Sequence, residues 1–196
     1  SGTGKSTLLR MVGGLQRPDS GKVVVAGTEI QGLDERDLAE VRRRLGMLFQ
    51  KGALLDSMTI FENIALPLRE HSSLSDAEIR AAIEDRLAAV GLEDVEDLLP
   101  GELSGGMLRR AALARAIVEE PEILLCDEPT GNLDGKTGHN IIELIFDLKQ
   151  KTGATLILIT HDQELAEKCD EIIHIEDGLI TDNMDAHENE GKKVAE

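Results

Sequence analysis

The chain has 196 residues, and its 21 basic and 38 acidic side chains give a formal net charge of −17. This charge argues against a general nucleic-acid binder, because neutralising phosphates needs a basic surface, so we expect no nucleic-acid partner. The 41% hydrophobic content excludes a disordered chain, and the length suits one domain or a domain with an inserted subdomain.

The chain begins inside a motif that binds phosphates. Residues 1–6, Ser-Gly-Thr-Gly-Lys-Ser, fill the last six positions of the phosphate loop G-x-x-x-x-G-K-[ST], and a helix is predicted to follow them. Glycines let consecutive backbone N–H groups point at phosphate oxygens, and the N-terminus of the helix attracts the same anion. Lys5 would reach the β- and γ-phosphates, and the Ser6 hydroxyl suits Mg²⁺.

Strand-like and helical segments alternate along much of the chain. The strand-like runs lie at residues 22–26, 45–49, 122–126, 154–160 and 171–176. The runs at 122 and 154 are continuously apolar, as expected of central strands covered on both faces. Residues 141–148 have helical spacing of apolar side chains, and Asp177-Gly178 indicates a hairpin turn. The alternation predicts an α/β fold with a mainly parallel sheet.

Residues 51–103 contain no convincing strand and are predicted to form an inserted α-helical subdomain. Ser75 and Glu78 have the spacing of a capping box, and a helical stripe of apolar residues follows them. We therefore expect a core of residues 1–50 and 104–182, a helical subdomain at 51–103, and a flexible polar tail at 183–196.

Two adjacent acids end the apolar run at 123–126. Asp127, at the carboxyl end of a central strand, would bind the same Mg²⁺ as Ser6, directly or through water. Glu128 is placed to orient an attacking water or to accept its proton. The alternative interpretation is that Asp127 and Glu128 are only two solvated acids at a strand end. The phosphate loop upstream makes this interpretation weaker.

Residues 103–107, Leu-Ser-Gly-Gly-Met, precede a helical run at 108–119 and form a second candidate anion site. One nucleotide does not need two helix N-termini and a phosphate loop from the same chain. The economical explanation is that the second site serves a nucleotide bound to another copy. This predicts a head-to-tail pair with two nucleotides between the protomers.

With these motifs in this order, the chain resembles the ATP-binding subunit of ABC transporters from Ser1 to Asp182, which implies a P-loop NTPase (RecA-like) core. The matching motifs are the Walker A loop at 1–7, the Q-loop at Gln50, the signature at 103–107, Walker B at 123–128, the D-loop at 132–134 and the switch histidine His161. The resemblance implies that the upstream core strands and the adenine-stacking aromatic residue are missing, and we expect an N-terminally truncated chain.

The resemblance also implies roles for single residues, with ATP and Mg²⁺ as the bound groups. Catalytic roles fall to Glu128, His161 and Gln50, and metal binding falls to Ser6, Gln50 and Asp127. The ATP-binding set is Ser1, Gly2, Thr3, Gly4, Lys5, Ser6, Thr7, Ser104, Gly105, Gly106 and Asp134. Gln50 would relay the nucleotide state to the helical subdomain, and His161 would contact the γ-phosphate.

Two transporter types compete within this resemblance. Segments 49–54, 67–71 and 102–107, including Met107 in place of the usual Gln or Glu, look like the ATPase of Mla/Mce phospholipid-trafficking systems. Segments 128–134 and 165–170 look instead like the lipoprotein-release and macrolide-export type. The first set lies in or beside the helical subdomain, which contacts the membrane subunit, so the sequence favours phospholipid transport.

No segment reaches the roughly 18 apolar residues that span a bilayer. The resemblance therefore implies separate transmembrane permease subunits and a peripheral location at the cytoplasmic face of the inner membrane. The alternatives are a soluble ABC ATPase outside transport, a P-loop kinase, which would lack the signature at 103–107, and an inert fragment. Cys126 and Cys169 are interpreted as free thiols.

Overall fold

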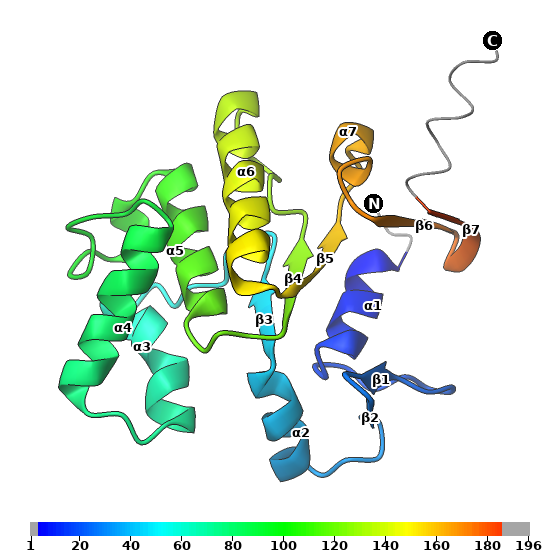
Figure 1. The fold of residues 1–196 in the computed structure, drawn as a ribbon, viewed down its shortest axis with the longest axis horizontal. Coiled ribbons are helices and arrows are strands. Elements are labelled where there is room, and N and C mark those ends of the chain that lie inside the picture. Colours follow the sequence, from blue (N-terminus) through cyan, green and yellow to red (C-terminus); the bar gives the residue numbers. More distant parts are fainter. Residues whose placement is uncertain (1–3, 186–196) are drawn as a thin grey trace.

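Three parallel strands, in the order β3-β4-β5, form the centre of the fold in the computed structural model, which describes residues 4–185 and side chains through residue 181 (Figure 1). The elements are α1 Lys5–Val12, β1 Val24–Val25, β2 Thr28–Glu29, α2 Glu35–Arg43, β3 Leu45–Leu48, α3 Ile60–His71, α4 Asp76–Ala89, the 3₁₀ turn η1 Pro100–Glu102, α5 Gly105–Ile117, β4 Ile123–Asp127, α6 Gly135–Thr152, β5 Thr155–Ile159, α7 Gln163–Ala166, β6 Glu171–Glu176 and β7 Leu179–Asp185. The predicted α/β architecture with a mainly parallel sheet is confirmed.

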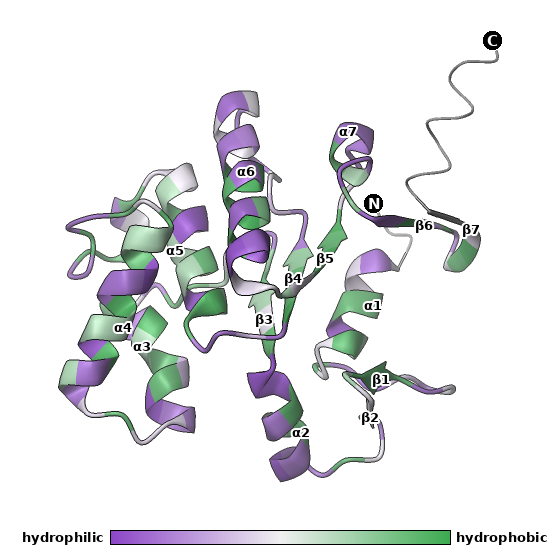
Figure 2. Ribbon diagram, in the orientation of Figure 1, coloured by the Kyte–Doolittle hydropathy of each residue, from purple (hydrophilic) through white to green (hydrophobic). Residues whose placement is uncertain are grey.

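Helices cover both faces of the central sheet. Leu124 and Cys126 of β4 belong to a core cluster that also holds the apolar faces of α5 and α6. Leu125 points the other way and lies beside Gly13 at the end of α1. Because successive strand side chains alternate between faces, β4 is apolar along its length. The three strands are accordingly largely green in the hydropathy view (Figure 2).

The segment 51–103 is helical, as its sequence pattern predicts. Thr59 and Ser75 cap α3 and α4, each in a capping box with a Glu three positions later. Ile79, Ile83 and Leu87 of α4 are buried against the main core. In Figure 1, α3, α4 and α5 gather on the side away from α1. The domain boundaries at 50/51 and 103/104 stay a prediction.

Two sequence expectations for strands need correction. Strand β2, at Thr28–Glu29, was not predicted, and its partner β1 is shorter than the expected run at 22–26. Residues 183–185, expected in a flexible tail, belong to β7, which pairs antiparallel with β6. Backbone pairing in the hairpin at Asp177-Gly178 supplies hydrogen bonds whatever the side chains, which is why a polar segment continues the strand. Residues 186–196 of the expected tail lie outside the described residues.

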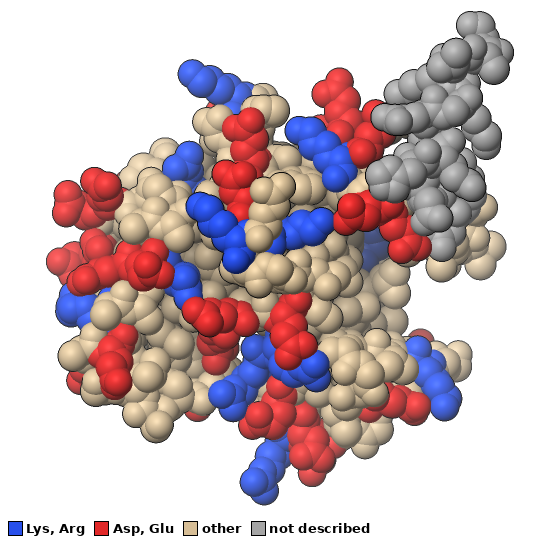
Figure 3. All heavy atoms as spheres, in the orientation of Figure 1, with Lys and Arg blue, Asp and Glu red and all other residues tan. Residues whose placement is uncertain are grey.

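The surface carries charges of both signs. Acidic and basic side chains are interspersed over the face shown in Figure 3, without a broad basic area. Cys126 and Cys169 are both free, as predicted. Burial raises the pKa of the Cys126 thiol to about 12, with nearby Arg109 acting in the opposite direction. Among residues 4–185, no helix is both long and apolar enough to cross a membrane.

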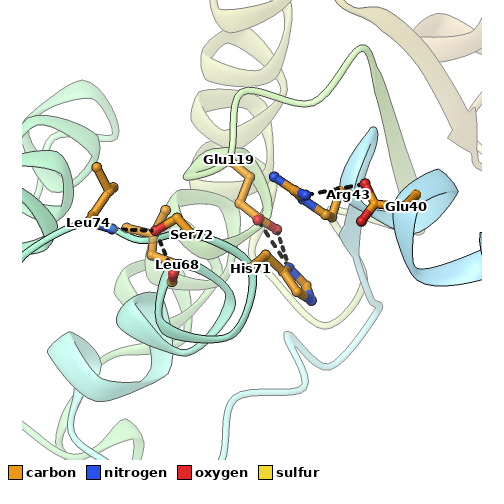
Figure 4. Close-up of polar contacts among 7 residues, drawn as sticks. All are labelled: Glu40, Arg43, Leu68, His71, Ser72, Leu74 and Glu119. Atoms are coloured by element: carbon orange, nitrogen blue, oxygen red, sulfur yellow. Dashed lines mark hydrogen bonds and ion pairs between the residues drawn. The ribbon is translucent and has the colours of Figure 1, made fainter. Parts of the chain in front are cut away.

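A side-chain contact joins the last residue of α3 to the segment that follows α5. His71 Nδ1 lies 3.1 Å from one carboxylate oxygen of Glu119 and 3.2 Å from the other (Figure 4). The same view shows Ser72 donating from its hydroxyl to the carbonyl oxygen of Leu68 at 2.7 Å. The sequence predicts no catalytic or binding role for His71, and its contacts are those of a structural residue.

The buried amide of Asn63 gives the first testable prediction, because it holds the loop that leads into α3. Its oxygen accepts from the N–H of Leu55 at 2.7 Å, and its nitrogen donates to the carbonyls of Leu55, Met58 and Thr59. Asn63→Ala removes the side-chain partner of the Leu55 N–H and of the Met58 carbonyl, whereas the carbonyls of Leu55 and Thr59 still accept from backbone N–H groups. We therefore expect the free energy of unfolding to fall by about 1–3 kcal/mol in urea titrations. The exposed control Asn140→Ala should change it by less than about 0.5 kcal/mol. Equal effects of the two variants would contradict this role.

Candidate active site

Ser6 and Asp127 meet at the carboxyl end of β4, although 121 positions separate them. The Ser6 hydroxyl, in the first turn of α1, donates to Asp127 Oδ1 at 3.0 Å, and Asp127 is only 7% exposed. A hydroxyl and a carboxylate are hard oxygen ligands of the kind that Mg²⁺ takes in nucleotide sites, where phosphate oxygens and waters complete its shell. No cluster of three or more His, Cys, Asp or Glu suited to a metal occurs among the described residues. The Ser6 and Asp127 pair therefore fits Mg²⁺ held together with a phosphate.

Glu128 leaves the strand through a left-handed turn. Its φ is 48°, an uncommon conformation for a residue with a side chain. Two backbone hydrogen bonds hold the turn, from Glu128 N–H to the carbonyl of Ile159 at 3.0 Å and from Gly131 N–H to the carbonyl of Glu128 at 2.9 Å. Strain of this kind persists where the surrounding structure fixes it, often at functional sites.

His161 follows the end of β5 and contacts Glu128. The two side chains meet at 2.7 Å, between His161 Nδ1 and Glu128 Oε2. The Glu128 side chain is 17% exposed and the His161 side chain 80% exposed, so the pair stands at the rim of the strand ends. The structure thus brings together Glu128, which the sequence predicts to act on a water, and His161, which the resemblance implies to contact the γ-phosphate.

The phosphate-loop residues Gly4, Lys5, Ser6 and Thr7 form the N-terminus of α1. Gly4 caps the helix with a φ of 89°, which glycine adopts without strain. The first turn of α1 therefore presents its N–H groups at the end of β4, where Ser6 meets Asp127. Ser1, Gly2 and Thr3 lie outside the described residues.

Gln50 follows β3 and lies against the segment that contains Glu128. A Cβ built on Gly131 would stand 3.3 Å from Gln50 Nε2 and 3.4 Å from its Cγ, so the Gln50 side chain rests on Gly131. The glycine permits this close approach, because a side chain at 131 would press on both Gln50 and the carbonyl of Glu128. Gln50 is thereby placed beside the turn that carries Glu128.

The signature residues lie elsewhere, at the N-terminus of α5. Ser104 caps α5 by accepting from Met107 N–H at 3.3 Å, and Gly105 and Gly106 form its first turn. A Cβ on Gly106 would stand 2.7 Å from a methyl of Thr137, so glycine allows α5 to approach α6. Figure 1 shows α5 and α1 on opposite sides of strands β3–β5. Within one chain, therefore, the signature does not complete the phosphate site.

Asp134 also stands at a helix N-terminus. Its carboxylate accepts from Thr137 N–H at 3.0 Å and caps α6. Hydrogen bonds from Thr137, first from its side chain and then from its backbone, lower the pKa of Asp134. The D-loop carboxylate is therefore held charged by Thr137, the residue against which Gly106 of the signature packs.

Sequence reasoning missed one residue of this region, Arg109. It is 6% exposed, and its guanidinium donates to the carbonyls of Phe49 and Gly131. The available signal was its place on the apolar face of the predicted helix, three and four positions before the buried Ala112 and Leu113. A buried cation at that position needs hydrogen-bond acceptors, and the sequence alone does not show which groups supply them.

Comparison with known proteins places the chain in a family. The family model described as ABC transporter matches residues 1–131. The methionine import ATP-binding protein MetN of Photorhabdus laumondii is 45% identical over 181 residues, which are 92% of this chain and 52% of the relative. MetN of Haemophilus influenzae strain 86-028NP is 44% identical over 183 residues, 93% of this chain and 53% of the relative. The chain thus spans about half the length of these relatives.

Solved structures agree with the sequence comparison. A dimeric ATP-binding cassette, MJ0796, bound to ADP and Pi has a TM-score of 0.86 at 35% identity, covering 94% of this chain and 82% of that one. A second dimeric structure of the same bacterial ABC transporter cassette has a TM-score of 0.87 at 36% identity and covers 95% and 82%. The α/β P-loop NTPase fold predicted from the sequence is confirmed by these neighbours.

Proposed function

Since the chain belongs to the ABC transporter family, we propose that it is the ATP-binding and ATP-hydrolysing subunit that powers a transporter through separate membrane subunits. One observation carries the proposal more than any other. Asp127 and Glu128 are consecutive residues at the end of β4, and each contacts a second residue of the site. Asp127 accepts a hydrogen bond from Ser6, and Glu128 contacts His161 beyond the end of β5. This arrangement supports the roles proposed here, a metal-binding pair beside a general base, as phosphoryl transfer to water requires.

Each residue of the site has a separate task in this function. Lys5 and the N-terminus of α1 bind the phosphates of ATP, and Ser6 and Asp127 hold Mg²⁺, which neutralises charge that develops on the transferred phosphoryl group. Glu128 accepts a proton from the attacking water. His161 fixes the carboxylate of Glu128 through their 2.7 Å contact and reaches toward the γ-phosphate. Gln50 senses the occupied site from its place beside Gly131.

Two copies are needed for complete sites in this proposal. Ser104, Gly105 and Gly106 of one copy contact the ATP bound by its partner, and Asp134 helps to join the copies. The separation of α5 from α1 within one chain supports this, as do the two dimeric cassettes of the same fold. Closure of the pair would move the helices of segment 51–103 against the permease.

The relatives' names bear on what is transported. Both curated relatives described above are methionine import ATP-binding proteins by name. Phospholipid trafficking, which segments 49–54, 67–71 and 102–107 favoured, is therefore not supported. We take methionine as the first candidate substrate and the cytoplasmic face of the inner membrane as the location. The test is uptake of labelled methionine into proteoliposomes. These contain this ATPase and the permease encoded by the neighbouring gene. ATP-driven uptake absent for methionine but present for another compound would overturn it.

Mixing two disabled chains tests whether sites are shared between copies. Ser104→Arg blocks a signature and Lys5→Ala disables a phosphate loop, so each variant alone should hydrolyse no ATP. A one-to-one mixture forms mixed pairs with one intact site, and we expect phosphate release at about a quarter of the parental rate if pairing is random. The matched control mixes the Ser104→Arg chain with a chain carrying both substitutions, which contains no intact combination. Activity of either single variant alone would contradict the shared site.

A further inference from the structure

Arg109 of α5 is a buried cation that joins two separate segments of the candidate site. Its Nη1 donates to the carbonyl oxygen of Phe49 at 2.8 Å, and its Nη2 donates to the carbonyl oxygen of Gly131 at 3.0 Å. Phe49 immediately precedes Gln50, and Gly131 lies between Glu128 and Asp134. One side chain therefore holds the backbone of the Gln50 segment and the backbone of the Glu128–Asp134 segment.

Stability alone explains this residue poorly. Among the described residues, no acidic side chain pairs with Arg109, and burial lowers its pKa. A buried cation without a counter-charge carries a desolvation cost that an apolar side chain of similar length would avoid. What the guanidinium adds is a rigid planar fork, which holds two acceptors at a fixed separation.

The two segments already touch at the point that Arg109 holds. The Gln50 side chain rests on Gly131, the same residue whose carbonyl accepts from Arg109. The N–H of Gly131 in turn donates to the carbonyl of Glu128 at 2.9 Å. Arg109 of α5 is therefore in contact with the backbone beside Gln50 and with the segment that carries Glu128.

We propose that Arg109 is a positioning residue that makes the Gln50 segment and the Glu128–Asp134 segment move together with α5. The proposal rests on the proposed function, in which Ser104 at the N-terminus of this helix contacts the partner's ATP. Contact at the signature would then set Gln50 and Glu128 at once. Without the fork, each segment would respond separately, and the general base would be poorly aligned in the closed pair.

Arg115, further along α5, provides a matched control. It also donates two hydrogen bonds to backbone carbonyls, to Ala53 at 2.7 Å and to Gly52 at 3.0 Å, and burial also lowers its pKa. Its two acceptors are neighbours in a single segment, however, so it joins nothing to the Glu128 turn. A loss that reflects only broken hydrogen bonds between an arginine and backbone carbonyls should appear equally in both variants.

The experiment compares Arg109→Met, Arg109→Lys and Arg115→Met with the parent by ATPase kinetics and by hydrogen exchange of backbone amides. We expect Arg109→Met to lower kcat by about 10- to 100-fold, because a small misplacement of the base is costly. Its KM for ATP should change by less than about threefold, because Lys5 and the phosphate loop are intact. Arg109→Lys keeps the charge but not the fork, so it should stay below the parent. Arg115→Met should keep kcat within about twofold of the parent at temperatures where both variants are folded.

Hydrogen exchange gives a result that does not depend on activity. Arg109→Met should speed exchange in residues 49–51 and in residues 129–134, whereas Arg115→Met should speed it in residues 51–55 only. Equal kcat losses in the two Met variants, or faster exchange confined to one segment in Arg109→Met, would overturn the coupling role. If the parent itself hydrolyses no ATP, the proposed function fails, and the exchange patterns alone then decide the role of Arg109.

Discussion

Replacement of Glu128 by Gln is expected to lower the rate of ATP hydrolysis by about 10²- to 10⁴-fold, the contribution of a positioned general base. The amide has the shape of the carboxylate and can still contact His161, where the parental distance is 2.7 Å. It lacks the basicity to take a proton from water. ATP binding by Lys5 and Ser6 is unaffected, so the ATP-bound pair of chains should accumulate, which gel filtration with MgATP would show as a dimer.

The exposed Glu143 of α6 offers a matched control for this variant. Glu143→Gln removes an exposed carboxylate that pairs with His139 of the same helix, so its hydrolysis rate should equal that of the parent. Phosphate release near the parental rate in Glu128→Gln would mean that another group activates the water. Loss of folding, seen as a lower midpoint of unfolding, would instead mean that Glu128 is needed for the turn itself.

Much of the fold was predictable because its core strands have strong local signals. The runs at 122–126 and 154–160 are apolar on both faces, and they form β4 and β5 in the middle of the sheet. Capping boxes at Thr59 and Ser75 begin α3 and α4. The misses were segments whose structure depends on a partner strand. Strand β2 has two residues and no apolar alternation, and the polar end of β7 is a strand only because it pairs with β6.

The candidate site was predictable to the extent that its motifs are local. Asp127, Glu128 and His161 lie at or just beyond the carboxyl ends of β4 and β5, which parallel pairing brings together. The sequence also predicts the meeting of Ser6 with Asp127, as a shared Mg²⁺ site. The left-handed turn at Glu128 was not predicted. Arg109 could not be found in this way, because its acceptors lie 60 and 22 positions away in the sequence. Which carbonyls face a buried arginine is decided by packing, and no local pattern records it.

Packing inside the chain also explains why these segments are a weak guide to the transported compound. Residues such as Met107 and the stretch at 67–71 lie in or beside helices whose contacts within the chain are satisfied by packing, for example Leu68 in the main core. The choice of residue at such positions is constrained by packing in the core as well as by contact with the membrane partner. Their resemblance to one transporter type is therefore a weaker guide to substrate than the phosphate-binding motifs are to ATP.

Lys5→Ala is expected to abolish most nucleotide binding, because it removes the one side-chain cation of the phosphate loop. Losing charged hydrogen bonds to the β- and γ-phosphates costs about 1.5–3 kcal/mol, which corresponds to an increase in Kd of about 10- to 100-fold. Alanine favours the helical conformation, so α1 itself should not weaken. Titration with a fluorescent ATP analogue in the presence of Mg²⁺ measures the change.

The exposed Lys151, in the last turn of α6, is the matched control for the lysine charge. Lys151→Ala makes the same change in net charge, from −17 to a more negative value, so any effect of overall charge on an anionic ligand appears in both variants. Only the loss that exceeds the control belongs to the phosphate loop. Equal Kd values for the two variants would contradict the assignment of Lys5, because a long-range effect of charge would then explain the whole change.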